Sequence, residues 1–73
     1  MEKCKENENV KFGQRVASLR IEKGISQEAL ALQCGINRTY MGEVERGEKS
    51  PSLTIIVKIA KGLNISLKTL FDY

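Results

Sequence analysis

The feature that most constrains the fold is a repeated stop-and-start signal that divides the chain into short segments. A glycine after an apolar stretch of helical spacing favours a helix end, and a Ser or Asn just before such a stretch favours a helix start. The signals recur so often that no segment exceeds about four helical turns. They predict five helices, over residues 10–23, 27–34, 38–46, 53–61 and 67–71. No segment alternates as a strand does, so the expected fold class is all-α.

Each expected helix has its own start and stop residues. The expected N-caps are Asn9, Ser26, Asn37, Ser52 and Ser66, and the expected terminators are Gly24, Gly35, Gly47 and Gly62. Apolar residues at helical spacing form the expected core: Phe12, Val16, Leu19, Leu30, Ala31, Cys34, Ile36, Met41, Val44, Leu53, Ile56, Ile59, Ala60, Leu63 and Ile65. A chain of 73 residues builds one small core. We place this domain at residues 10–73, after a flexible polar tail over residues 1–9.

The most informative pair of helices lies on either side of Gly35. Helices joined by so short a turn cross steeply, which requires a small residue at their closest approach and a residue tolerant of positive φ at the turn. Ala31 and Gly35 meet these two requirements in one register. An ordinary antiparallel pair of helices would accept a larger residue at position 31, so the sequence favours a helix-turn-helix.

A wider set of motifs carries a family resemblance over residues 12–71. The motifs are Ser26-Gln27-Glu28-Ala29-Leu30-Ala31, Gly35-Ile36, Glu45-Arg46-Gly47, Pro51-Ser52-Leu53, Ile59-Ala60 and Leu63. Together they resemble the XRE family of Cro and phage-repressor proteins. The run Arg38-Thr39-Tyr40 with Glu45-Arg46, in so short a domain, is most similar to controller proteins of restriction–modification systems.

This resemblance implies a compact five-helix, lambda-repressor-like domain that acts as a sequence-specific, DNA-binding transcriptional regulator. For a controller protein it also implies autoregulation of a restriction–modification operon. Phage-type repressors and antitoxins of toxin–antitoxin pairs share most of the motifs and remain alternatives. An antitoxin usually carries a longer neutralising segment outside the helix-turn-helix, and we do not expect residues 1–9 or the two residues after Phe71 to serve as one.

The helix over residues 38–46 is the expected recognition helix. Such a helix enters the major groove with its N-terminal residues at the base edges. Arg38 is therefore the first candidate for a bidentate contact with guanine. Thr39 is expected to touch a thymine methyl group or a phosphate, and Gly42, which has no side chain, permits close approach to the DNA.

Two further residues of this helix have roles that the sequence leaves open. Tyr40 packs either on DNA, at the backbone or a base step, or partly in the protein core. Glu43 would repel phosphates on a DNA-facing surface. We therefore expect it either to accept a hydrogen bond from a cytosine amino group or to hold Arg46.

Phosphate contacts are expected on both sides of the recognition helix. Gln27 begins its helix, where its amide and the free backbone N–H groups can meet a phosphate. Asn37 and Arg46 lie at the ends of the recognition helix, and Lys49 and Ser50 follow in the next turn. A capping or solvated role is the alternative for each of these residues.

One pair of charges lies on otherwise apolar helix faces. Arg20 continues the line of Phe12 and Val16, and Glu45 continues the line of Met41. Either charge would be costly to bury alone. We therefore predict a structural salt bridge between Arg20 and Glu45 that holds the recognition helix, as the family resemblance also implies.

The C-terminal part of the chain has more apolar residues than a short helix can bury within one subunit. These residues are Ile55, Val57, Leu67, Leu70, Phe71 and Tyr73. Operators are usually bound by symmetric dimers, because one short helix contacts too few base pairs. We predict a homodimer formed by the last two helices on a palindromic double-stranded DNA operator, with closure of a small core as the alternative.

Composition argues against other functions. The chain has no His, its cysteines Cys4 and Cys34 form no metal-binding motif, and no nucleophile is paired with a base. We therefore expect no enzymatic activity, metal, cofactor or small-molecule ligand. The longest strongly apolar run, residues 55–57, is too short to span a membrane. The net charge of +3 is a modest bias towards a polyanion. We expect a cytoplasmic protein, encoded by a bacterium or a phage.

Overall fold

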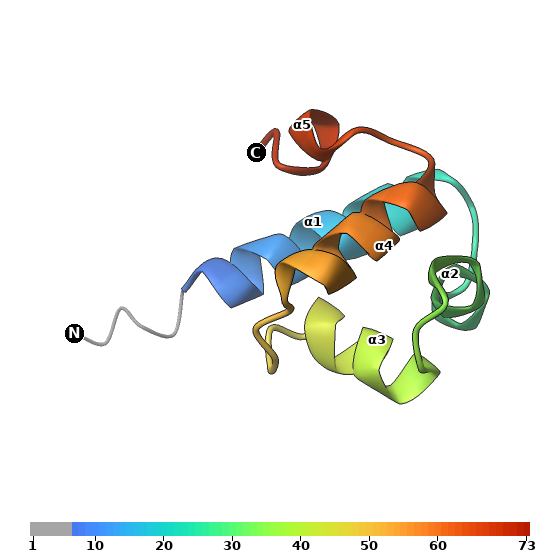
Figure 1. Ribbon diagram of the computed structural model, residues 1–73, viewed down its shortest axis with the longest axis horizontal. Coiled ribbons are helices and arrows are strands. Elements are labelled where there is room, and N and C mark those ends of the chain that lie inside the picture. The colour runs from blue at the N-terminus through green and yellow to red at the C-terminus, as the bar shows by residue number, and fades with distance from the viewer. Residues whose placement is uncertain (1–6) are drawn as a thin grey trace.

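The computed structural model describes residues 7–73, which form five helices and no strand. The helices are α1 (Glu8–Glu22), α2 (Gln27–Cys34), α3 (Arg38–Glu45), α4 (Leu53–Leu63) and α5 (Leu67–Leu70). Figure 1 shows α1 and α4 through the middle of the molecule, with α2 and α3 on one side and α5 on the other. The prediction of an all-α, five-helix fold is confirmed.

Capping by local side chains explains where the helices begin. Ser26 Oγ accepts a hydrogen bond from the N–H of Ala29 at 3.0 Å, and Asn37 Oδ1 accepts one from the N–H of Tyr40 at 3.1 Å. Ser52 and Ser66 make the equivalent bonds at the starts of α4 and α5. These four caps are the predicted ones. Each satisfies one backbone donor that a helix start leaves without an internal partner.

The first helix begins two residues earlier than predicted. Asn7, rather than Asn9, caps α1, and its Oδ1 accepts from the N–H of Val10 at 3.1 Å. This start places Glu8 in the first turn, where a negative charge interacts favourably with the helix dipole. Glu8 and Asn9 therefore belong to the helix and not to a tail. The rest of the predicted tail, residues 1–6, lies outside the described residues.

The end of α4 also differs from the prediction. The helix does not stop at Gly62 but continues to Leu63, and Asn64 adopts the left-handed conformation that ends it, with φ of 60°. Gly62 serves a different purpose, since a β-carbon at this position would overlap Cys34 Sγ. The glycine is required because α2 and α4 approach closely there.

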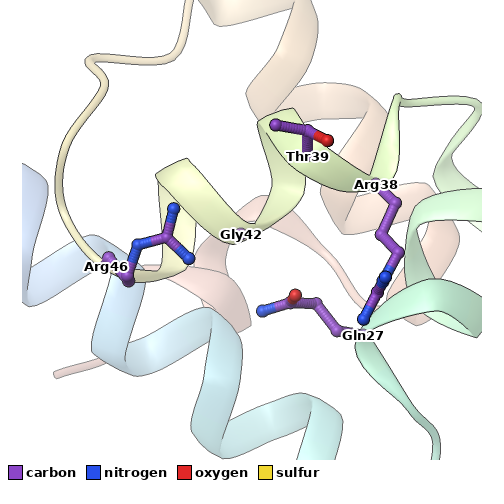
Figure 2. A pocket seen from close by; sticks show the side chains of 5 residues that line it. All are labelled: Gln27, Arg38, Thr39, Gly42 and Arg46. Carbon is purple, nitrogen blue, oxygen red and sulfur yellow. The ribbon is translucent and has the colours of Figure 1, made fainter.

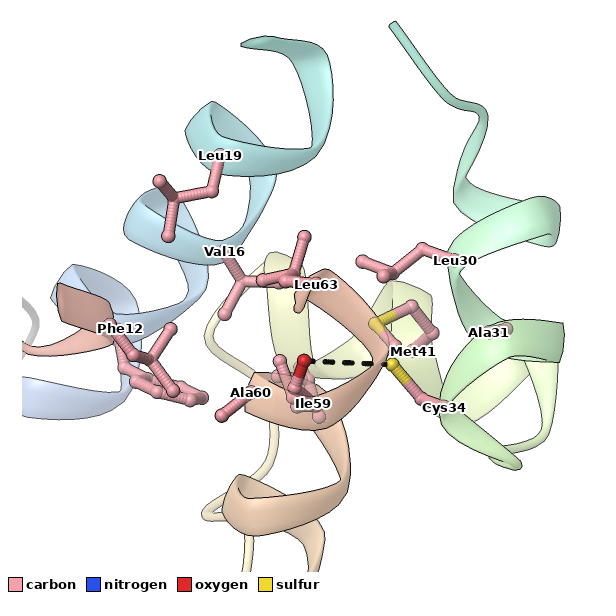
Figure 3. Close-up of a cluster of buried hydrophobic side chains, with 12 residues drawn as sticks. Phe12, Val16, Leu19, Leu30, Ala31, Cys34, Met41, Ile59, Ala60 and Leu63 are labelled. Atoms are coloured by element: carbon pink, nitrogen blue, oxygen red, sulfur yellow. Dashed lines mark hydrogen bonds between the residues drawn. The ribbon is translucent and has the colours of Figure 1, made fainter. Parts of the chain in front are cut away.

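The buried core joins all five helices. Its members are Phe12, Val16, Leu19, Leu30, Ala31, Cys34, Met41, Val44, Ile59, Ala60, Leu63 and Leu70. Figure 3 shows side chains from α1, α2 and α4 meeting around Leu63, with Cys34 Sγ directed at the carbonyl oxygen of Ile59, 3.9 Å away. Ile36, Ile56 and Ile65 are half-buried against this core.

One predicted core residue is wrong. Leu53 has 71% of its surface exposed. It lies on the same face of α4 as Ile56 and Ala60, but burial declines along this face towards the start of the helix. Ala60 is buried and Ile56 half-buried. The apolar stripe therefore extends beyond the elements that cover it.

Candidate nucleic-acid interface

The helix pair α2–α3 forms the predicted helix-turn-helix. Gly35 adopts the left-handed conformation, with φ of 71°, and the N–H of Ile36 then donates to the carbonyl oxygen of Ala31 at 2.9 Å. Helix α3 packs against α1 at Gly13, where a β-carbon would overlap the carbonyl oxygens of Val44 and Glu45. The backbones of α1 and α3 are thus in direct contact, which fixes the position of α3 in the fold.

A buried polar network holds the end of α3. Arg20 Nε and Nη2 donate to the two oxygens of Glu45 at 2.9 and 3.1 Å. The side chain of Arg20 is 16% exposed and that of Glu45 is 6% exposed. Arg20 Nη1 also donates to the carbonyl oxygen of Ile25 at 3.1 Å. The ion pair that the sequence predicts between these residues is present, and it ties α1 to α3.

The network extends to Gln27, a contact that the sequence does not indicate. Gln27 Nε2 donates to Glu45 Oε1 at 3.0 Å. The same carboxylate therefore neutralises Arg20 and orients the amide at the start of α2. Nothing in the sequence points to this contact, because the two residues are 18 positions apart.

A shallow polar depression of about 250 Å³ lies between α2 and α3. It is lined by Gln27, Arg38, Thr39, Gly42 and Arg46. Figure 2 shows Arg38 and Arg46 towards opposite ends of α3, with Gln27 extending towards the middle of the helix. A β-carbon on Gly42 would lie 3.1 Å from Arg46 Nη1 and 3.3 Å from Gln27 Oε1. The missing side chain keeps the depression open.

The predicted base-contacting residues divide into two groups. Arg38 and Thr39 are exposed and line the depression. Tyr40 and Glu43 are half-buried and do not line it. Tyr40 packs against the core, which corresponds to the alternative that the sequence left open for it.

Arg46 is held by Glu48 instead of Glu43. Arg46 Nε and Nη2 donate to the Glu48 carboxylate at 2.8 and 3.2 Å. This hydrogen bond lowers the pKa of Glu48 and raises that of Arg46, because each charge favours the ionised form of the other. The role of holding Arg46, considered above for Glu43, thus falls to Glu48. The only indication of this contact in the sequence is that Arg46 and Glu48 carry opposite charges two residues apart.

The remaining predicted phosphate contacts lie around the depression. Asn37 uses its side-chain oxygen to cap α3. Lys49 and Ser50 are exposed in the segment after α3 and do not line the depression. Ser50 instead borders a second hollow of about 330 Å³, which also includes Phe12, Ile56, Phe71 and Tyr73 among its lining residues.

The predicted dimer surface needs one correction. Leu67, Phe71 and Tyr73 are 41%, 46% and 56% exposed, and Ile55 and Val57 are half-buried. Leu70, in contrast, has no exposed surface within the single chain, so it belongs to the core. A short helix directs one side chain inwards per turn, and in α5 this side chain is Leu70.

Two features are absent from residues 7–73. In that part of the chain, no group of three or more acidic, Cys or His residues is placed to hold a metal ion. Nor does it contain a helix of the length and apolar character needed to cross a membrane.

Comparisons with known proteins show which proteins this chain resembles in sequence. A family model described as "Helix-turn-helix" matches residues 16–70. Control protein C.BamHI of Bacillus amyloliquefaciens is 44% identical over 63 residues, which cover 85% of this chain and 78% of that protein. Control protein C.MunI of Mycoplasma sp is 41% identical over 64 residues, 86% of each chain.

A solved structure agrees with these sequence matches. The restriction–modification controller protein C.AhdI from Aeromonas hydrophila superposes with a TM-score of 0.84 and 51% sequence identity. The superposition covers 86% of this chain and 96% of that one. The resemblance to controller proteins inferred from the motifs is confirmed.

Proposed function

The chain belongs to the helix-turn-helix family of DNA-binding transcriptional regulators, and from this premise we propose that it is a controller protein of a restriction–modification system. In this role it binds a palindromic operator as a homodimer, in the cytoplasm, and regulates its own operon. The role is regulatory and not enzymatic. The observation that carries the proposal is the polar depression between α2 and α3, with Arg38 at the N-terminal end of α3.

Base recognition follows from the position of α3. With α3 in the major groove, the exposed side chains of Arg38 and Thr39 meet the base edges. The guanidinium group of Arg38 matches the two acceptors of guanine, O6 and N7. Gly42 allows the DNA to approach the middle of the helix, since no side chain projects from it there.

Backbone contacts come from the start of α2. Gln27 is the first residue of α2, where backbone N–H groups without internal partners favour an anion. Its Nε2 group already donates to Glu45, so the backbone N–H groups are the main donors left for a phosphate at this helix start. A phosphate placed here sets the register of α3 in the groove but carries no sequence information itself.

Dimerisation supplies the rest of the specificity. One α3 helix contacts only a few base pairs, and two helices on a symmetric operator double the sequence that is recognised. The exposed apolar side chains of Leu67, Phe71 and Tyr73 support an interface at the C-terminal end of the chain. The half-buried Val57 of α4 is a further candidate for this interface, whereas Ile55 packs against the core.

The test compares binding to the DNA upstream of the protein's own gene with binding to random DNA of equal length. The wild-type protein is expected to prefer the upstream DNA. Arg38→Ala should weaken binding to it by about 5- to 150-fold, equivalent to roughly 1–3 kcal/mol, with far less effect on random DNA. Lys61→Ala is the control, because it removes one positive charge from the exposed face of α4. No preference by the wild type, or equal losses of Arg38→Ala on both DNAs, would contradict the proposal.

A further inference from the structure

Arg15, in the middle of α1, reaches the end of the distant helix α5. Its Nε donates to the carbonyl oxygen of Leu70 at 3.2 Å, and its Nη2 donates to that of Thr69 at 2.7 Å. These carbonyl groups belong to the last turn of α5, where a helix leaves carbonyl oxygens short of partners; that of Thr69 also accepts from the N–H of Asp72 at 3.2 Å. A positive charge at this end of a helix also interacts favourably with the helix dipole.

Helix α5 depends on such contacts because it has only four residues. A helix this short is not stable in isolation. Three interactions attach it to the rest of the fold: burial of Leu70, the two bonds from Arg15, and stacking of Phe71 on Phe12. The two rings are 5.5 Å apart at their centroids. Arg15 and Phe12 are three residues apart on α1, so they lie on the same face of that helix.

The segment that α1 holds in this way carries the exposed apolar side chains at the end of the chain. Leu67 and Phe71 are 41% and 46% exposed, and the ring of Tyr73 follows that of Phe71 at 6.3 Å between centroids. A second copy of this chain is the partner that such a surface fits, because the proposed function requires a symmetric dimer.

Helix α1 also supports the DNA-binding side of the molecule. Gly13 contacts the backbone of α3, and Arg20 holds Glu45 at the end of α3. Arg15 lies between these two residues in sequence. The same helix therefore supports both α3 and the C-terminal segment, and that segment also packs against α4.

We propose that Arg15 is a positioning residue for dimerisation, which fixes the C-terminal segment of residues 67–73 so that a second copy of the chain meets a preformed surface. The proposal rests on the dimeric function proposed above. A surface that is already ordered loses less conformational entropy when it binds. Arg15 thereby also sets the spacing between the two recognition helices of the dimer, without contacting DNA.

The experiment replaces the donors of Arg15 but keeps its aliphatic stem. Arg15→Met is compared with Lys11→Met, which removes the same charge from the exposed face of α1, one turn away. The dimer dissociation constant is measured by sedimentation at a temperature at which circular dichroism shows all variants folded. Affinities for the full operator and for an isolated half-site are measured in parallel.

The expected result separates dimerisation from recognition. Arg15→Met should raise the dimer dissociation constant about tenfold or more, since it removes two hydrogen bonds from a charged donor. Its operator affinity should fall, because the second half-site no longer benefits from a high effective concentration. Its half-site affinity should stay within about twofold of wild type, and Lys11→Met should match wild type in all three measurements. A merely structural loss would lower operator and half-site affinity together.

A second variant keeps the test decisive if Arg15→Met does not fold. Arg15→Lys retains the charge but only one compact donor group, so its dimer dissociation constant should lie above that of the wild type. Wild-type dimerisation in Arg15→Met, or in Arg15→Lys if only that variant folds, would overturn the inference and leave the proposed function intact. A wild-type protein that is monomeric, or that binds the operator no better than a half-site, would instead contradict the proposed dimeric function.

Discussion

Glu45 is the polar residue whose replacement we expect to lower the stability of the fold most. Its carboxylate accepts three hydrogen bonds, two from Arg20 and one from Gln27. Glu45→Ala leaves the guanidinium group of Arg20 in a site where its side chain is only 16% exposed, with the carbonyl of Ile25 as its remaining partner. The expected loss is therefore that of an unpaired buried charge and not that of a surface ion pair.

The size of the effect follows from this burial. Breaking a buried ion pair by removing one partner costs about 3–5 kcal/mol, whereas an exposed pair contributes about 1 kcal/mol or less. A chain of this length has a free energy of unfolding of roughly 4–11 kcal/mol. Each kcal/mol lost lowers the melting temperature of such a domain by about 4–8 °C. Glu45→Ala should thus lower it by at least about 12 °C and bring the protein close to its stability limit.

Thermal unfolding followed by circular dichroism measures this shift. Glu22→Ala is the matched control, since it removes an exposed carboxylate from the end of α1 and should change stability by no more than about 0.5 kcal/mol. The double variant Arg20→Met with Glu45→Met should recover much of the loss, because neither charge is then left unpaired. A shift for Glu45→Ala no larger than that of Glu22→Ala would refute the reasoning, as would a double variant less stable than either single methionine variant.

Three further predictions test the packing, the interface and the buried thiol. Gly13→Ala should lower the free energy of unfolding by about 1–3 kcal/mol in denaturant titrations, because the added methyl group overlaps the backbone of α3; unchanged stability would contradict the close approach of α1 and α3. Gly42→Ala should leave the melting temperature unchanged or higher, since alanine favours a helix, but weaken operator binding by filling the depression between α2 and α3; unchanged affinity would mean that DNA does not approach Gly42. Burial raises the pKa of the Cys34 thiol from 9.0 to about 11. Between these two pH values the thiol ionises in the unfolded chain but not in the folded one, which lowers the free energy of unfolding. The stability that this thiol contributes is complete below pH 9 and should be lost as the pH rises towards 11. In denaturant titrations, the free energy of unfolding of Cys34→Ala should fall less over that range than that of the wild type, and an equal fall would exclude this cause.

The sequence alone determined the features that depend on neighbours within a few positions. A cap at Ser26 or Asn37 requires only a side-chain oxygen and a backbone N–H three residues later, so both helix starts were predictable. The turn at Gly35 was predictable for the same reason. The charges on apolar faces at Arg20 and Glu45 also allowed their pairing to be inferred, because two buried charges that could meet have few alternatives.

The tertiary structure alone decided which surfaces are covered and which distant groups meet. Leu53 and Leu70 both continue apolar stripes, but only Leu70 lies where other helices cover it. Gly62 resembles a helix terminator in sequence, and its true role depends on Cys34, 28 positions earlier, packing directly against it.

The contacts of Arg15 and Gln27 also depend on the tertiary structure. Arg15 donates to carbonyl groups 54 and 55 positions away, and Gln27 to a carboxylate 18 positions away. Local hydrogen bonds depend on backbone geometry that repeats from helix to helix, so their partners can be identified by their separation in the sequence. Burial and long-range hydrogen bonds depend on how the helices are placed in space, and that placement results from the packing of all of them together.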